Sequence, residues 1–301
     1  MKSEYAIKDR ETTTISAPER EGNSEWTTVI RPWNPWFKLD LSGIWRYRDL
    51  IRLFVRRDFV ALYKQTILGP LWFIIQPLFT TIVFTVVFGK IAKIPTEGIP
   101  DFLFFLSGNV VWGYFSGCLT GTSNTFASNA GLFGKVYFPR LTVPISSVIS
   151  KIAQFAIQFS LFIVFYLYFL TVNSTIVPNL WILIVPLLLL QMALLGLGTG
   201  ILISSLTTKY RDLDFAVVFG VQLWMYATPI VYPLSQIPER FHKFFSLNPM
   251  TAIVETFRYA FFGKSAITTS DMVISWCVTL CILLAGMILF SRVEKVFMDT
   301  V

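Results

Sequence analysis

The sequence predicts an all-α integral membrane protein with six transmembrane helices, an N-terminal amphipathic helix at the membrane surface and a re-entrant helical hairpin on the outer side. Composition is the first reason: 54% of the 301 residues are hydrophobic and only 14% are charged, whereas soluble domains carry about 25% charged residues. The second reason is a set of long uncharged runs, and the third is an uneven distribution of Lys and Arg. With three Cys and one His, neither a disulfide scaffold nor a metal site is expected.

The N-terminal part divides into two segments. Residues 1–40 are polar and poor in core-forming residues, so we expect a flexible extension. Over residues 41–66, apolar and basic side chains fall on opposite sides of a helical wheel, which suits a helix lying in the cytoplasmic headgroup layer. Arg56 and Arg57 on the basic side are candidates for contact with a cytoplasmic partner, and a passive membrane anchor is the alternative.

The transmembrane helices come from runs without Asp, Glu, Lys or Arg. These runs are 65–89, 102–134, 152–208, 215–238 and 272–291. A helix needs about 20 apolar residues to cross a bilayer, so the third run can cross twice, with a polar turn that ends in a proline between the crossings. The predicted spans within a transmembrane domain at 67–295 are 68–89, 102–125, 145–171, 178–206, 214–235 and 271–291. Residues 296–301 form a short tail.

The distribution of Lys and Arg predicts the orientation, because cytoplasmic loops carry an excess of them. With six spans, both termini and the loops after the second and fourth spans lie on one side. That side carries nineteen Lys and Arg residues, and the other side carries six. Both termini are therefore expected in the cytoplasm, and the net charge of +7 reflects this topology and does not indicate nucleic-acid binding.

The source of energy is indicated by what the five runs lack. They contain no Asp, Glu, Lys, Arg or His, whereas transporters driven by protons or sodium usually keep an ionisable residue in the membrane. Lys151 lies near a cytoplasmic end and can extend to the interface. The sequence around Gly263 mimics the end of a phosphate-binding loop, but Arg258 stands where the first glycine is needed. The chain therefore looks like a transport path that a separate nucleotide-hydrolysing subunit drives.

Two other classes of protein stay open as alternatives. One is an ion-coupled transporter, because sodium can bind through carbonyl and hydroxyl oxygens alone. The other is a membrane glycosyl- or acyltransferase, for which Glu239, His242 and Glu255 are the only cluster suited to acid–base chemistry. No nucleophile stands at a suggestive spacing from that cluster, so an enzyme is not expected.

Two cytoplasmic loops carry candidate partner contacts. In the loop at 126–144, two Gly and two Pro leave room for short helical turns, and we expect apolar side chains with a basic rim to project as a knob into a partner's groove. A loop that merely lies on the membrane is the alternative. The candidate residues of this knob are Leu132, Phe133, Lys135, Tyr137, Phe138 and Arg140. The second loop adds Lys209, Arg211 and Asp212, which a solvated turn would explain equally well.

The outer segment at 236–264 is too long and too apolar for a plain loop. Two short amphipathic helices fit it, with a break before Pro249 because proline disfavours helix in the preceding residue. Glu255 and Arg258 are spaced to pair on one helix. We expect a re-entrant or interfacial hairpin that serves as an outer gate, with a rigid cap as the alternative, and the gate candidates are Asn248, Pro249, Glu255 and Arg258.

Aromatic residues are dense near the membrane boundaries, where such rings commonly anchor a protein. Sugar rings also stack on aromatic rings, so a path rich in Trp, Tyr, hydroxyl and amide groups, without fixed charge, would suit a sliding glycan. The second span offers this mixture between Asn109 and Asn124, although small polar residues serve helix packing as well. The candidate pathway residues are Trp72, Trp112, Tyr114, Phe115, Trp224, Tyr226 and Tyr232.

Five motifs occur in order over about residues 43–295. They are RDFVALYKQTILGPLWFIIQP at 57–77, FGKVYFPR at 133–140, KYRDL at 209–213, ATPIVYP at 227–233, and LNPM at 247–250 followed by Glu255 and Arg258. Together they resemble the polysaccharide-export permeases of the ABC transporter superfamily, which are the membrane subunits for O-antigen, capsule and teichoic-acid precursors.

The resemblance implies a two-fold dimer in the bacterial inner membrane, paired with two cytoplasmic ATPase subunits around a channel for lipid-linked polysaccharide. It also implies that the loop at 131–140 docks on the ATPase, that the helix at 43–64 flanks it, and that the hairpin at 236–262 is a periplasmic gate. ATP and Mg²⁺ would bind to the partner, and this chain would hold no cofactor and would not be an enzyme. The expected cargo is of O-antigen type, and an exporter of the same architecture for a drug or another lipid is the runner-up.

Overall fold

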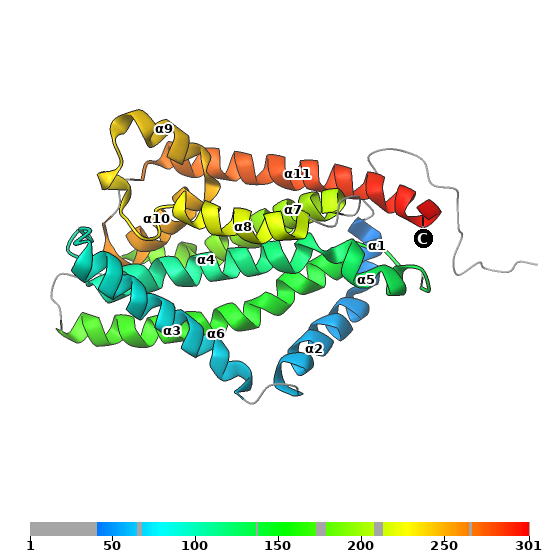
Figure 1. The fold of residues 1–301 in the computed structure, drawn as a ribbon, viewed down its shortest axis with the longest axis horizontal. Helices are drawn as coiled ribbons and strands as arrows, with labels where there is room; N and C mark the ends of the chain where they lie inside the picture. Colours follow the sequence, from blue (N-terminus) through cyan, green and yellow to red (C-terminus); the bar gives the residue numbers. More distant parts are fainter. Residues whose placement is uncertain are drawn as a thin grey trace, which may run out of the picture. The chain divides into compact units, whose positions relative to one another are not determined.

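The structure, a computed structural model, describes residues 41–64, 68–136, 138–172, 179–207, 213–264 and 267–300. Every regular element in these ranges is a helix (Figure 1), which confirms the predicted all-α fold. The helices belong to one unit, Trp36–Val301. The predicted extension at 1–40 lies outside the described residues.

Two helices precede the transmembrane part. They are α1 (Leu41–Arg46) and α2 (Arg48–Lys64), and Tyr47 separates them. Helix α2 packs against α6, and its side chain Phe54 is buried. Other apolar side chains of α2, such as Leu53, are exposed. The amphipathic pattern therefore divides α2 into a packed face and a free face, and its place at a membrane surface stays a prediction.

Within the described residues, five helical stretches are long and apolar enough to cross a membrane: Gly69–Ile91, Asp101–Ser123, Thr142–Val172, Leu180–Thr207 and Thr269–Glu294. They correspond to five of the six predicted spans. Their helices are η1 (Gly69–Leu71), α3 (Trp72–Phe84), η2 (Thr85–Ile91), α4 (Asp101–Ser123), α6 (Thr142–Val172), η3 (Leu180–Ile184), α7 (Val185–Thr207) and α11 (Thr269–Thr300).

The fifth predicted span, 214–235, is shorter than expected. Helix α8 (Leu213–Tyr226) has 14 residues, which gives about 21 Å at 1.5 Å per residue, less than the ~30 Å of a hydrocarbon core. The chain then turns without a helix, because Pro229 lacks a backbone N–H and disfavours helix in the residue before it. A single helix over 214–235 is therefore wrong, and the count of six complete spans is not confirmed.

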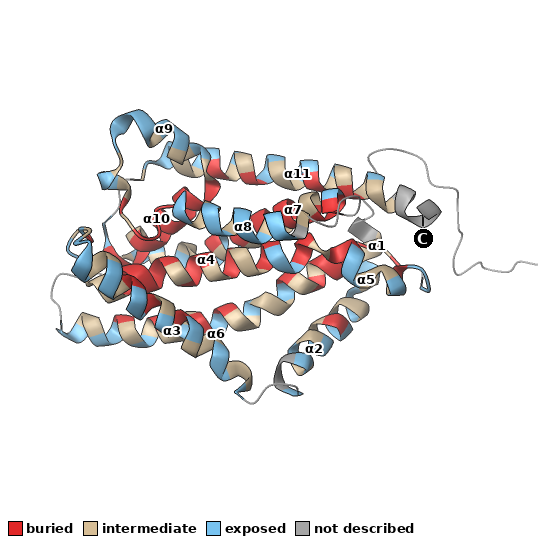
Figure 2. Cartoon of the chain, viewed as in Figure 1, coloured by how far each residue is buried: buried red, intermediate tan, exposed pale blue. Residues whose placement is uncertain are grey.

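After this turn come η4 (Leu234–Gln236), α9 (Glu239–Leu247) and α10 (Pro249–Phe262). All residues of α10 except Tyr259 are buried, whereas none of α9 is, a contrast that Figure 2 shows by colour. Helix α10 packs against α4, α7 and α11. The predicted hairpin thus consists of one buried helix packed among the long helices and one helix without buried residues, and its re-entrant place in a membrane stays a prediction.

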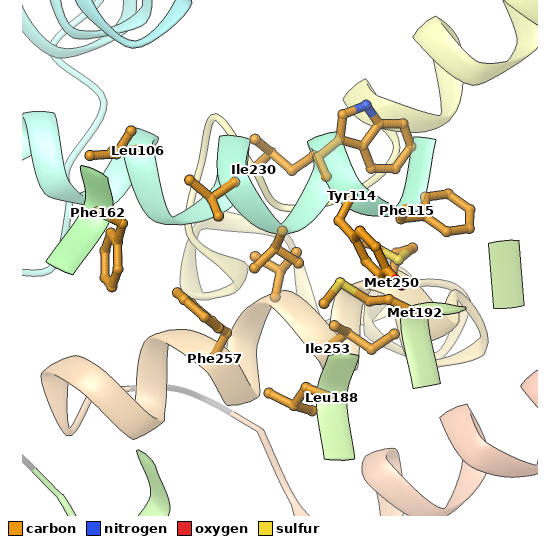
Figure 3. Packing of buried hydrophobic residues seen from close by; sticks show 14 of the residues in the cluster. Leu106, Tyr114, Phe115, Phe162, Leu188, Met192, Ile230, Met250, Ile253 and Phe257 are labelled. Carbon is orange, nitrogen blue, oxygen red and sulfur yellow. The ribbon is translucent and has the colours of Figure 1, made fainter. Parts of the chain in front are cut away.

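The main core surrounds α4, which packs against α3, α6, α7, α8 and α10. Figure 3 shows part of it, including Phe162 of α6 and Phe257 of α10, whose ring centroids are 5.4 Å apart. Glycines bring other helices close together: a Cβ atom at Gly198 of α7 would lie 2.7 Å from Cα of Leu283 in α11. Small residues permit such close backbone contact between membrane helices.

Candidate functional site

A groove of about 410 Å³ lies between α3, α4, α6 and α8. Nine of the sixteen residues that line it are polar, although it runs along helices that are apolar enough to cross a membrane. The polar lining residues are Gln76, Thr80, Asn109, Ser116, Thr120, Lys151, Gln154, Gln158 and Gln222. Because polar groups facing hydrocarbon are costly, this surface is suited to water or to a polar ligand.

Helical periodicity brings these side chains together. The residues that α4 contributes stand three or four positions apart and therefore share one face, and they are Asn109, Trp112, Gly113, Ser116, Gly117 and Thr120. On α6, Lys151, Gln154 and Gln158 follow the same spacing. Side chains elsewhere around α4, such as Tyr114 and Phe115, enter the core instead.

Some groove groups already have partners in the protein. The Asn109 amide donates to the Pro77 carbonyl over 3.3 Å and to the Thr81 hydroxyl over 3.4 Å, which holds α4 against α3. The Thr120 hydroxyl donates to the Ser116 carbonyl over 2.8 Å. A hydroxyl that donates still has lone pairs to accept with, so these residues can also bind a ligand.

Gln158 differs because its amide carbonyl is not satisfied. Its side chain is 5% exposed and lines the groove, and Oε1 has no hydrogen-bond partner among the described residues. A Cβ atom at Gly113 would lie 3.1 Å from Oε1, so the glycine makes room for this buried oxygen beside α4. A buried acceptor without a partner costs about 1–3 kcal/mol, which a ligand hydroxyl or a water would offset.

The aromatic residues predicted for the pathway lie in different surroundings. Trp112 contributes to the lining of the groove, although it is only 5% exposed and also belongs to the core, and its ring centroid is 6.5 Å from that of Trp224. Tyr114 and Phe115 were expected on the path, but they are 2% and 0% exposed and belong to the core. They fail as candidates because they stand on other faces of α4.

The remaining pathway candidates lie away from the groove. Trp72 and Tyr226 are exposed, and the Tyr232 hydroxyl donates to the Tyr226 carbonyl over 2.7 Å. Asn109, Ser116 and Thr120 belong to the polar mixture expected on the second span, whereas the glutamines that line the groove were not predicted, because they are single residues within long apolar runs. The signal that could have found them is their spacing: Gln154 and Gln158 repeat at a helical interval on one predicted span.

Asn248, a predicted gate residue, connects the end of α8 to the start of α10. Its Oδ1 accepts from Nε1 of Trp224 over 3.0 Å and from the Met250 backbone N–H over 3.1 Å. Its Nδ2 donates to the Ala227 carbonyl over 3.1 Å and to the Thr228 hydroxyl over 3.0 Å. It thereby caps α10, and Pro249 follows at the first helical position, where proline fits well.

The predicted pair of Glu255 and Arg258 is confirmed, with a separation of 3.2 Å. Both side chains are buried, and the guanidinium lies 3.7 Å from the ring centroid of Phe104 in α4. Arg258 also donates to the carbonyls of Pro229 over 2.6 Å and Ile230 over 2.8 Å. These bonds satisfy backbone groups in the turn after α8, so the pair stabilises the non-helical segment among apolar helices.

The loop predicted to project toward a partner is folded inward. Helix α5 (Thr125–Phe133) ends at Phe133, which is 2% exposed, and Phe138 is 6% exposed. The expectation that these two rings form an exposed knob is therefore wrong, because they fill a second apolar cluster instead. The members of this cluster, called here the α5 cluster, are Phe54, Phe126, Phe133, Phe138, Val143, Ile201 and Phe290.

Arg140 is buried beside the α5 cluster and is not part of an exposed rim. Its guanidinium lies 5.3 Å from the Phe133 ring centroid and donates to the Glu294 carbonyl over 2.9 Å. Burial lowers the pKa of Arg140, and the Glu294 carboxylate counteracts this shift. The group therefore joins the start of α6 to the end of α11.

The exposed candidates for partner contact are fewer than predicted. Lys135 and Val136 are exposed and Leu132 is half-buried. On α2, Arg56 is exposed, as is Arg57, which pairs with Asp58 at 2.9 Å. The other candidates, Tyr137, Lys209, Arg211 and Asp212, lie outside the described residues.

Similar proteins match most of this chain. The O-antigen export system permease protein RfbA of Klebsiella pneumoniae is 26% identical over 254 residues, which are 83% of this chain and 94% of that relative. RfbA of Myxococcus xanthus is 24% identical over 86% of this chain and 97% of the relative. The capsule polysaccharide export inner-membrane protein CtrC of Neisseria meningitidis serogroup A is 23% identical, with 85% and 95% covered.

These similarities confirm the resemblance to polysaccharide-export permeases. The family model described as ABC-2 type transporter matches residues 49–262. That match extends from α2 to the end of α10 and includes the groove and the buried Glu255–Arg258 pair. With most of its length matched, this multi-pass membrane protein belongs to the ABC-2 type transporter family.

Proposed function

We propose that this chain is the permease subunit of an ATP-driven exporter that moves lipid-linked polysaccharide of O-antigen type across the bacterial inner membrane. The observation that carries the proposal is the groove of amides and hydroxyls along membrane-spanning helices. A glycan presents many hydroxyls that need hydrogen-bond partners when they leave water. Amide side chains supply both donors and acceptors.

The lining of the groove also suits movement of a polymer. Transport requires binding that is favourable enough for entry and weak enough for release. The groove offers many neutral hydrogen-bonding groups and the ring of Trp112. A sugar unit can therefore exchange one set of partners for the next without a deep energy minimum. The relatives named for O-antigen and capsule export support this cargo.

A second copy of the chain would complete the path. Beside the groove, α8 presents exposed apolar side chains, including Phe215, Phe219 and Leu223. Helix α8 is too short to span a bilayer by itself. In the proposed two-fold dimer, these α8 faces contact the partner copy, and two grooves together enclose the channel.

Energy would reach the groove through the α5 cluster. In the proposed complex, two cytoplasmic ATPase subunits with bound ATP and Mg²⁺ contact Lys135, Val136 and the exposed arginines of α2. The α5 cluster includes Phe54 of α2, Ile201 of α7 and Phe290 of α11. Because these side chains are closely packed, movement of α5 would be transmitted to several spans at once. Both termini would face the cytoplasm, and the chain itself would not be an enzyme.

The test is co-expression of the chain with its candidate ATPase subunit, in a strain that lacks its own glycan exporter. We expect a complex of two permease and two ATPase chains and restored surface glycan. An ATPase that cannot hydrolyse ATP is the matched control and should give the complex without export. The proposal is overturned if vesicles containing this polypeptide alone move the glycan uphill.

A further inference from the structure

Lys151 is the one charged side chain among the residues that line the groove. Its stem crosses the face of α4 at two glycines: a Cβ atom at Gly117 would lie 3.6 Å from Cδ of Lys151, and one at Gly121 would lie 3.5 Å from Cε. The glycines leave space for this long side chain. Lys151 is thus directed into the groove across α4.

No acidic residue balances this charge in the groove. The lining residues include neither Asp nor Glu, and no carboxylate in the described part of the chain pairs with Lys151. Asp58 accepts a hydrogen bond from the neighbouring Ser150, but it already pairs with Arg57 at 2.9 Å. An ammonium within a membrane is costly unless an anion balances it, so an anion that enters the groove would be favoured there.

The groups next to Lys151 are suited to a sugar. On α6, Gln154 stands about one turn away and Gln158 about two turns away on the same face. The buried carbonyl oxygen of Gln158 accepts no hydrogen bond from the described residues, and sugar hydroxyls are donors. The groove therefore combines one cation with a row of neutral hydrogen-bonding groups, an arrangement that matches a saccharide bearing an anionic group.

We infer that Lys151 binds an anionic group of the cargo, a phosphate or a carboxylate, while Gln154 and Gln158 bind neighbouring hydroxyls. This inference rests on the proposed glycan path and adds a substrate class to it: saccharides that carry a negative charge. The anion binds at the end of the groove nearer α5, because Gly121 is four residues before the start of that helix.

The test compares binding of three radiolabelled disaccharides to the full chain in nanodiscs of neutral phosphatidylcholine. Maltose and maltose 1-phosphate differ only by the phosphate, and disialic acid supplies carboxylates. We expect both anionic sugars to bind about tenfold more tightly than maltose, as a hydrogen bond to a charged group typically gives. Lys151→Gln should remove this preference, Lys151→Arg should retain it, and Lys135→Gln, an exposed lysine outside the groove, should leave it unchanged.

Each outcome bears on the inference. Preference for only one anionic sugar supports it and identifies phosphate or carboxylate as the group that is bound. Equal binding of all three sugars to the unaltered chain overturns the inference. A preference for anionic sugars that Lys151→Gln does not change also overturns it. Neither result contradicts the proposed glycan groove. If none of the three sugars binds, the proposed glycan groove is contradicted as well. The comparison in the unaltered chain does not depend on any variant folding.

Discussion

Gln158 and Arg258 are two polar side chains that are buried among apolar helices for different reasons. Arg258 is bonded to two backbone carbonyls and to Glu255, and it stacks on Phe104. Gln158 lines the groove with a carbonyl oxygen that no described residue bonds. The first arrangement stabilises the fold, and the second leaves a buried acceptor beside the groove without a donor among the described residues.

We predict that Gln158→Leu lowers glycan export about tenfold, because it removes a hydrogen-bonding group worth about 1–1.5 kcal/mol to the cargo. Thermal stability should be unchanged or slightly raised, since the substitution also removes an unbonded buried carbonyl. Surface glycan and the unfolding temperature are measured together. Ser160→Ala, at an exposed position on the same helix, is the control, and export equal to that of the control would contradict a role in the path.

For the buried ion pair, we predict that Arg258→Met destabilises the protein by about 3–5 kcal/mol, because Glu255 is left as an unpaired buried charge. Replacing both residues by Met should cost less than the sum of the two single changes. Thermal unfolding of the purified chain in detergent measures this double-mutant cycle. Additive effects would mean that the two charges do not stabilise each other.

At the scale of elements, the segments between helices do most to shape this protein. The turn after α8 is held by hydrogen bonds that Arg258 and Asn248 of the following hairpin donate to its backbone carbonyls. Helix α5 packs against Phe54 of α2, Ile201 of α7 and Phe290 of α11. In both places a short segment depends on side chains far away in the sequence, so a change in one segment alters the packing of several helices.

Because α5 folds inward, a substitution there can weaken ATPase binding either by destabilising the fold or by removing a surface contact. We predict that Phe133→Ala destabilises the chain by about 3–5 kcal/mol, as expected for loss of a buried ring, and weakens ATPase association indirectly. Val136→Asp, at a side chain that is 54% exposed, should weaken co-purification of the ATPase without changing the unfolding temperature. Normal co-purification of the ATPase with the Val136 variant would count against Val136 and its neighbour Lys135 as the docking site.

At the scale of the whole molecule, the path that the described residues of one chain provide is an open groove. The groove lies beside exposed apolar residues of α8. One face of helix α4 lines the groove with polar side chains and Trp112, and its other faces supply residues of the main core. A second copy facing α8 would convert two open grooves into one channel, which connects the proposed dimer to the proposed transport path.

The dimer gives a prediction at this scale. Phe219→Ala with Leu223→Ala should shift the purified protein from dimer to monomer in light scattering, because it removes exposed apolar surface from α8. Val164→Ala with Leu167→Ala is the matched control, since these α6 residues are similarly exposed and lie away from α8 in the sequence. A dimer that persists in the α8 variant, or dissociates equally in the control, would argue against this interface.

The sequence by itself determined the class of the protein, five of its long helices and the pairing of Glu255 with Arg258. Hydrophobic runs and i, i+3 spacing are local properties, and burial in a membrane follows from them directly. Only the tertiary structure decided which face of α4 lines the groove, that α10 is inserted among the spans, and that Phe133 and Phe138 point inward. These features depend on contacts between residues far apart in the chain, and an apolar side chain has the same local pattern whether it meets lipid, a partner or another helix.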